Sequence, residues 1–251
     1  MTAIVRLTRA EFRKLATTRS YPITLIVAVG LALLEVAAVA MAAGRNGVPR
    51  LGSAAGTNQM LKLGAICSVA MLVVGIMAAG GEFRHKTIIP AVLISPRRNG
   101  LVLAKAIAVG AAGVVLSSLT FGLGLATAVA VLAFRHFHHL PADTWRLYAG
   151  SVISGTLFGL IGVALGFITR STVAAALGAV GWVLFGEIVI LGTMAPHLAR
   201  WLITGASMAL TDPAVPGAST LAPTTATAVL SAYALALLAA AVGVLARRDI
   251  G

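Results

Sequence analysis

Residues 63–80 read LGAICSVAMLVVGIMAAG, a run without a single charged side chain. A bilayer core about 30 Å thick is crossed by roughly 20 apolar residues of α-helix, since each residue adds about 1.5 Å of rise. The run therefore predicts a transmembrane helix. It leads directly into a charged segment that begins at Glu82.

Apolar runs of similar length lie on both sides of this stretch. They cover 22–43, 103–134, 147–169, 171–195 and 221–246. The whole chain is 59% hydrophobic and only 10% charged, with a mean hydropathy of +0.99, which no water-soluble domain of this size requires. We expect an all-α polytopic membrane protein, with six transmembrane helices in one domain over residues 1–251.

The basic residues are divided unevenly between the two sides that six spans define. Thirteen of the 19 Lys and Arg residues fall at the chain ends and in the even-numbered loops, and six fall in the other loops. Because basic residues accumulate on the cytoplasmic side, both termini are expected there. The net charge of +12 comes from short clusters beside the spans, so we do not expect nucleic acid as a partner.

Residues 2–20 predict an amphipathic helix at the membrane surface. At about 100° per residue, Ile4 and Leu15 share one arc, and Arg6 and Arg9 lie on the opposite one. Such a helix lies in the headgroup layer with its basic face toward water and anionic lipid. On the external side, 198–210 is too short to cross and is expected to be a re-entrant or surface helix.

The segment between the second and third spans carries the most information about function. Residues 82–98 read EFRHKTIIPAVLISPRR, with a charged start, an apolar middle and a basic end. This pattern fits a short amphipathic helix along the cytoplasmic surface, which offers a partner protein both charges and apolar contacts.

At this segment the chain resembles a permease subunit of the ABC type-2 exporter family, in its compact bacterial six-helix form. Such permeases carry an acid, an aromatic residue, a base and a threonine just after the second span, then a Pro-Arg element and a lysine entering the third. The matching residues are Glu82, Phe83, Arg84, Thr87, Pro96, Arg97, Arg98 and Lys105. The chain departs from the family at Lys86, Ile88 and Ile89, since related permeases often have a glycine or another small residue beside the threonine.

The resemblance implies a permease of a bacterial plasma membrane. It would be paired with a second copy or with a related permease, and docked on an ABC ATPase subunit. ATP and Mg would be bound in that partner, so no cofactor is expected in this chain. The residues expected to couple ATPase motion to the permease are Glu82, Phe83, Arg84, Lys86, Thr87, Arg97 and Arg98. Efflux, including efflux that confers antibiotic resistance, would be the biological role.

No enzymatic site is predicted in this chain. A phosphate-binding loop needs a Gly-Lys pair, and none occurs. Neither a zinc-binding H-E-x-x-H pair nor a G-x-S-x-G elbow is present. His136, His138 and His139 could bind a metal, but we interpret them as an exposed loop cluster.

Two acidic residues interrupt the apolar runs, and each is a candidate for the translocation path. Glu35 lies in the first span and Glu187 in the fifth. Charge in hydrocarbon is costly and by default indicates function. Two interpretations remain open: contact with a cargo or proton-sensitive gating on one hand, and a structural carboxylate satisfied by nearby donors on the other.

Four glycines in the fourth span share one side of the predicted helix. They are Gly155, Gly159, Gly162 and Gly166. Small residues at this spacing allow a second helix to approach closely. That neighbour is either internal or in a second subunit, and we favour an internal one.

These features support three functional hypotheses. The first is the membrane-spanning subunit of an ATP-driven exporter for an amphipathic cargo such as a drug, peptide or lipid. The alternative is an ion- or proton-coupled carrier that uses Glu35 and Glu187. The third is a membrane partner that senses or anchors without transporting.

Overall fold

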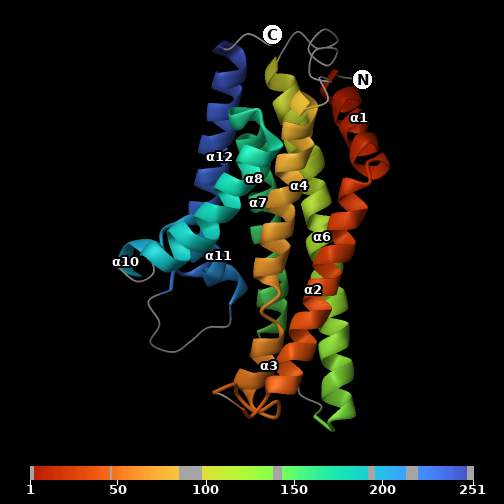
Figure 1. Ribbon diagram of the computed structural model, residues 1–251, viewed down its shortest axis with the longest axis vertical. Coiled ribbons are helices and arrows are strands. Elements are labelled where there is room, and N and C mark those ends of the chain that lie inside the picture. Colours follow the sequence, from red (N-terminus) through yellow and green to blue (C-terminus); the bar gives the residue numbers. More distant parts are fainter. Residues whose placement is uncertain are drawn as a thin grey trace.

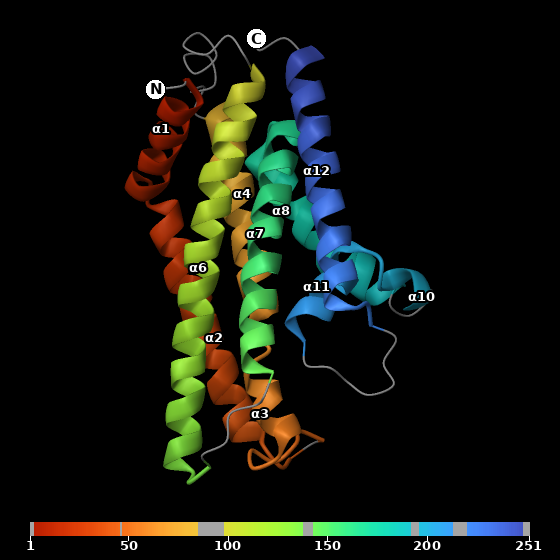
Figure 2. The same cartoon turned by 180° about the vertical axis from the view of Figure 1, so that it is seen from behind.

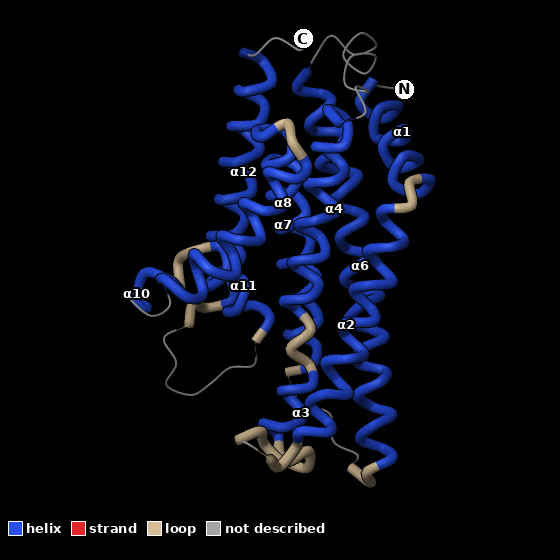
Figure 3. Tube along the Cα trace, viewed as in Figure 1, coloured by secondary structure: helices blue, strands red, loops and turns tan. Residues whose placement is uncertain are grey.

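The structure of this chain is a computed structural model that describes residues 3–45, 47–84, 98–137, 143–191, 196–212 and 220–247. In these ranges every regular element is a helix and no strand occurs (Figure 3). The all-α class expected from the sequence is therefore confirmed for the described part of the chain.

Five helices are long and apolar enough to cross a membrane. They are α2 (Ser20–Ala42), α4 (Gly64–Arg84, preceded by the short α3, Ala54–Met60), α6 (Arg98–Phe134), α7 (Thr144–Thr169) and α12 (Pro223–Arg247). Each coincides with a run identified in the sequence. Together they indicate a membrane-inserted helical bundle.

The fifth predicted span differs from this pattern. Residues 171–195 contain α8 (Thr172–Gly181), which continues as the π-helix η1 (Trp182–Leu191). The indole of Trp182 covers Gly186, where an added Cβ would lie 2.7 Å from the indole Cε3 atom. The wider turn of the π-helix leaves room for the Trp182 indole to pack against Gly186, which has no side chain. The structure therefore supports five long spans, with a shorter apolar helix in the place of the fifth predicted one.

The helices run alternately up and down the long axis of the molecule (Figures 1 and 2). The first helix, α1 (Ala3–Thr17), lies at the same end as the carboxyl end of α12, and α3 lies at the opposite end. With 37 residues, α6 is about 55 Å long and extends the full height of the bundle.

The centre of the bundle is the contact between α4 and α7. A Cβ added to Gly75 would lie 2.1 Å from the carbonyl oxygen of Gly159, and one added to Gly162 would lie 2.3 Å from that of Leu72. The two backbones touch where side chains would normally separate them. Gly166 also faces α4, and Gly155 lies closest to Ser117 of α6, so the neighbours of all four α7 glycines lie within this chain.

The segment after η1 folds back against the bundle. A short turn, α10 (Pro196–Ala199), precedes α11 (Ile203–Thr211), which lies at mid-height between α7 and α12 (Figure 2). Its residues Ala206, Ser207 and Leu210 are buried. The Ser207 hydroxyl shares a hydrogen bond of 2.7 Å with Ser154 of α7, which fixes the depth of α11 in the bundle.

Candidate functional site

The charged residue that opens the predicted coupling segment lies inside the protein. Glu82 belongs to the last turn of α4 and is 5% exposed. α4 continues beyond the predicted span end and brings this carboxylate against α1 and α6. Since an isolated buried carboxylate is very costly, partners are required.

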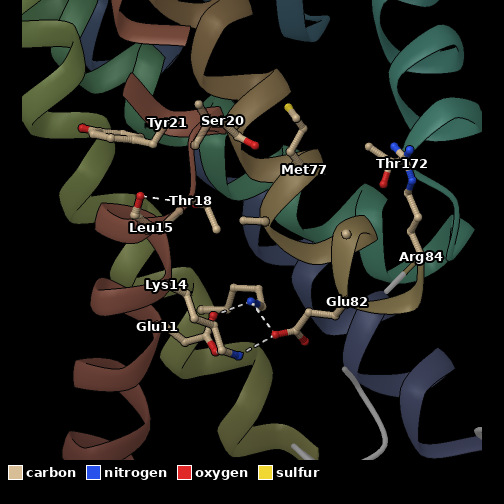
Figure 4. Close-up of a pocket in the computed structure, with 14 residues that line it drawn as sticks. Glu11, Lys14, Leu15, Thr18, Ser20, Tyr21, Met77, Glu82, Arg84 and Thr172 are labelled. Carbon is tan, nitrogen blue, oxygen red and sulfur yellow. Dashed lines mark hydrogen bonds and ion pairs between the residues drawn. The ribbon is translucent and has the colours of Figure 1, made fainter. Parts of the chain in front are cut away.

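Two lysines and a second carboxylate surround Glu82. Its Oε1 atom accepts hydrogen bonds from Lys14 (2.9 Å) and from Lys105 (3.1 Å). Lys14 also donates to Glu11 Oε1 at 2.6 Å, and Lys105 donates to Glu11 Oε2. We call Glu11, Lys14, Glu82 and Lys105 the ion cluster, which is drawn in Figure 4.

The ion cluster joins three helices that are far apart in the sequence. Glu11 and Lys14 come from α1, Glu82 from α4 and Lys105 from α6. Its formal charges balance, with two carboxylates and two ammonium groups. Lys105, Glu11 and Glu82 are 2%, 4% and 5% exposed, so water contributes little to their solvation. Each charge therefore depends on the others.

The pKa values of the two α1 residues reflect this mutual dependence. Burial raises the pKa of Glu11, but the charge of Lys105 and the hydrogen bonds from both lysines outweigh it, so that the pKa lies below its ordinary value of 4.5. Burial lowers the pKa of Lys14, but the hydrogen bonds to Glu11 and Glu82 raise it by more. The pKa of Lys14 therefore lies above its ordinary value of 10.5. Both side chains are thus charged at neutral pH.

The next residue in the segment ties α4 to a fourth helix. The Phe83 ring packs edge-on against Phe167 of α7, with centroids 6.2 Å apart. The guanidinium of Arg170, just after α7, lies 5.6 Å from the centre of the Phe83 ring, at the distance of a cation–π contact. The amino-terminal side of the predicted coupling segment is therefore anchored to α1, α6 and α7.

The remaining predicted coupling residues differ in position. Arg84 ends α4 and is exposed, and Arg98 begins α6. Lys86, Thr87 and Arg97 lie outside the described residues. The structure thus brings Glu82 together with Lys105, both of which carry the family resemblance, while Arg84 stays apart from the ion cluster.

Glu11 and Lys14 were not among the site residues predicted from the sequence. The signal was present, because at about 100° per residue Glu11 falls within the apolar arc of the helix, between Leu7 and Leu15. An acidic residue on an apolar face predicts a buried cationic partner. Which cation pairs with it depends on tertiary structure.

Glu187, a candidate for the translocation path, lies in η1 and is 3% exposed. Its Oε1 atom accepts a hydrogen bond of 2.9 Å from the indole of Trp182, and its Oε2 atom accepts one from the backbone N–H of Thr204 in the first turn of α11. Both oxygens are thus engaged by donors. The carboxylate links η1 to the amino end of α11, where the helix dipole favours negative charge.

Glu35, the other candidate, is partly buried on α2. It is close enough to Lys62 and Asp212 for their charges to act on it. Those two form an ion pair of 3.1 Å, and Arg146 donates to the backbone oxygen of Asp212 at 2.9 Å. This second group of charges connects the end of α11 to the beginnings of α4 and α7.

Metal ligation finds no support in the described ranges, where no group of three or more His, Cys, Asp or Glu side chains could hold an ion. His136 follows α6 in a left-handed backbone conformation, with φ of 61°. His138 and His139 lie outside the described residues.

Comparison with protein-family models and with curated protein sequences finds no match for this chain.

Proposed function

We propose that this chain is the membrane-spanning permease subunit of an ATP-driven exporter, in which a separate subunit binds and hydrolyses ATP. One observation carries the proposal: the ion cluster clamps both ends of the segment that would receive the ATPase. Glu82 precedes residues 85–97, and Lys105 follows them two turns into α6. A force on this segment reaches α4 and α6 through a buried contact.

The helices at the clamp are connected to the rest of the bundle. Because α4 and α7 touch backbone to backbone at Gly75 and Gly159, a displacement of α4 must move α7 with it. Phe83 adds a direct contact with α7 at the same end. A push on the coupling segment would thus move α1, α4, α6 and α7 as a unit, as alternating access to a path through the bundle requires.

The proposed cargo is amphipathic, such as a drug, peptide or lipid, because the described bundle is apolar and carries few intramembrane charges. A second permease copy, or a related permease, would complete the path. Of the two acidic candidates, Glu35 is the better suited to contact a cargo, since Glu187 already accepts two hydrogen bonds.

The first test is copurification of the tagged chain from its native membrane, followed by identification of bound proteins. Arg84→Glu is the sharpest variant, because Arg84 is exposed and lies outside the ion cluster. Arg247→Glu is the matched control at the same end of the bundle, on α12. We expect an ATPase subunit with the unaltered chain and the control, and its loss with Arg84→Glu.

Two outcomes would overturn the proposal. One is the absence of any ATPase from native preparations of the unaltered chain. The other is transport by the purified chain alone in proteoliposomes, driven by a proton gradient and abolished by Glu35→Gln. The second result would establish the proton-coupled carrier instead.

A further inference from the structure

A cavity of about 390 Å³ lies beside the ion cluster, within the usual size range of ligand pockets. Its floor is the face of α4 that includes Val74, Met77 and Gly81. The α1–α2 corner forms one wall, and Thr172 at the start of α8 forms the other (Figure 4). The ion cluster lines one end.

The cavity changes in chemistry along its length. Its charged end is lined by Lys14 and Lys105 against two carboxylates, with Arg84 on the facing side, near Thr172 (Figure 4). Toward the middle of α4 it is apolar, and Met77 is 37% exposed there. From Glu82 to Val74 the helix rises about 12 Å, so a molecule in the cavity would have a polar end and an apolar end.

The polar end carries surplus positive charge. Three cations against two carboxylates leave one positive charge in the lining. In the described part of the chain no ion pair engages Arg84. Figure 4 shows its side chain extending toward Thr172, whose hydroxyl oxygen has no hydrogen-bond partner in the described structure. Nearby, Arg6, Arg9 and Arg13 line an adjoining hollow with Lys14.

We propose that this cavity binds an anionic phospholipid, with the headgroup phosphate between Lys14 and Arg84 and an acyl chain along Met77 toward Val74. Clusters of Lys and Arg at the membrane surface attract anionic lipid, and only an amphiphile satisfies both ends of the cavity. The lipid would wedge α1 and α8 apart over α4. This inference requires a membrane-inserted bundle and does not depend on export.

Gly81 provides a precise way to block the site. A Cβ added there meets nothing within 4 Å, although the residue lines the cavity. Gly81→Leu would therefore fill the cavity without a clash, and leucine favours the helix more than glycine does. Gly178→Leu is the matched control, because a Cβ at Gly178 on α8 also meets open space but lies outside the cavity.

Native mass spectrometry of the delipidated full chain, with phosphatidylglycerol or phosphatidylcholine added back, tests the proposal. We expect one phosphatidylglycerol to be retained in preference to phosphatidylcholine. Arg84→Gln and Gly81→Leu should each lower that retention about fivefold, as expected for the loss of one basic contact or of the acyl-chain site. Gly178→Leu should retain the lipid like the unaltered chain.

A second measurement uses the unaltered chain, so its result does not depend on whether the variants fold. Phosphatidylglycerol with a photoreactive acyl chain should cross-link to the 74–81 region of α4. Equal retention of both lipids, full retention by a folded Gly81→Leu variant, or cross-links only elsewhere would overturn the proposal. So would displacement of the lipid by soluble glycerol phosphate, which would identify a site for free phosphate.

Discussion

Lys105 has the smallest exposed fraction of any charged side chain in the described part of the chain, 2%. It donates to both carboxylates of the ion cluster, whereas Lys14, with 47% of its side chain exposed, can still be hydrated. Removing Lys105 would leave Glu11 and Glu82 facing each other with one partly hydrated cation between them. The ion cluster is therefore more vulnerable at Lys105 than at Lys14.

Lys105→Met is expected to lower the free energy of unfolding by about 3–5 kcal/mol, the typical result of removing one partner of a buried ion pair. Lys14→Met should cost much less, because its exposure reduces the strength of its interactions. Thermal unfolding of the purified chain in detergent measures both. If Glu82→Lys with Lys105→Glu recovers no stability over Lys105→Glu alone, the pairing described here is wrong.

At low pH, α1 is expected to detach from α4 and α6. The pKa of Glu11 lies below 4.5 in the folded protein, so its contribution to stability is complete above 4.5 and is lost as the pH falls through the lower, folded value. Lys14, whose pKa lies above 10.5, loses its contribution only in strong alkali. A spin label at the exposed Ala10 should become mobile only at a pH below 4.5, as measured by electron paramagnetic resonance. In Glu11→Gln the label should be mobile throughout; an unchanged acid transition there would contradict this assignment.

At the scale of the helix, the contact between α4 and α7 tolerates no added side chain. Gly162→Leu should prevent folding or cost more than about 3 kcal/mol, since its Cβ would lie 2.3 Å from the Leu72 carbonyl oxygen and backbone cannot rearrange cheaply. Gly178→Leu, where the Cβ meets open space, should fold normally. Yield of monodisperse protein after size-exclusion chromatography separates the two. A well-behaved Gly162→Leu variant would show that the helices are further apart.

The π-helix η1 and α11 are held together by Glu187. Replacing it with leucine should cost about 1–3 kcal/mol, because the Thr204 N–H and the Trp182 indole lose their acceptor. Glu187→Gln should cost less, since its amide oxygen can keep one of these bonds. Fluorescence of Trp182, with Trp145 and Trp201 replaced by Phe, should shift most in Glu187→Leu. Equal emission spectra for Glu187, Glu187→Gln and Glu187→Leu would refute the contact between Trp182 and Glu187.

The sequence predicted helices well and their local geometry poorly. Five long spans follow from apolar runs of about 20 residues, because composition largely decides whether a segment partitions into lipid. Residues 171–195 are equally apolar, yet part of this stretch is π-helical. Hydropathy does not encode the hydrogen-bond register of this helix, nor the packing of Trp182 over Gly186 within it. The partners of Glu82 depended on α1, which the amphipathic pattern placed at the surface.

In the whole molecule, α1 and the carboxyl end of α12 lie at one end of the bundle and α3 lies at the other (Figure 1). If the basic end is cytoplasmic, as the charge distribution predicts, a cysteine at Arg6 should react with a membrane-impermeant maleimide only after cells are permeabilised. One at Ser53, just before α3, should react in intact cells. Cys67 is buried and is replaced by serine for this experiment. The reverse labelling pattern would show that the orientation in the membrane is opposite to the predicted one.

The ion cluster also sets an order of assembly. The chain is synthesised from its amino end, and α1 emerges before α4, which emerges before α6. Lys14 can pair with Glu11 and Glu82 as soon as α4 is made, but their buried partner Lys105 is added only after residue 105 has left the ribosome and α6 has begun to insert. The complete ion cluster therefore forms only once α6 is in place. The first helix, α1, thus completes its contacts late in biogenesis.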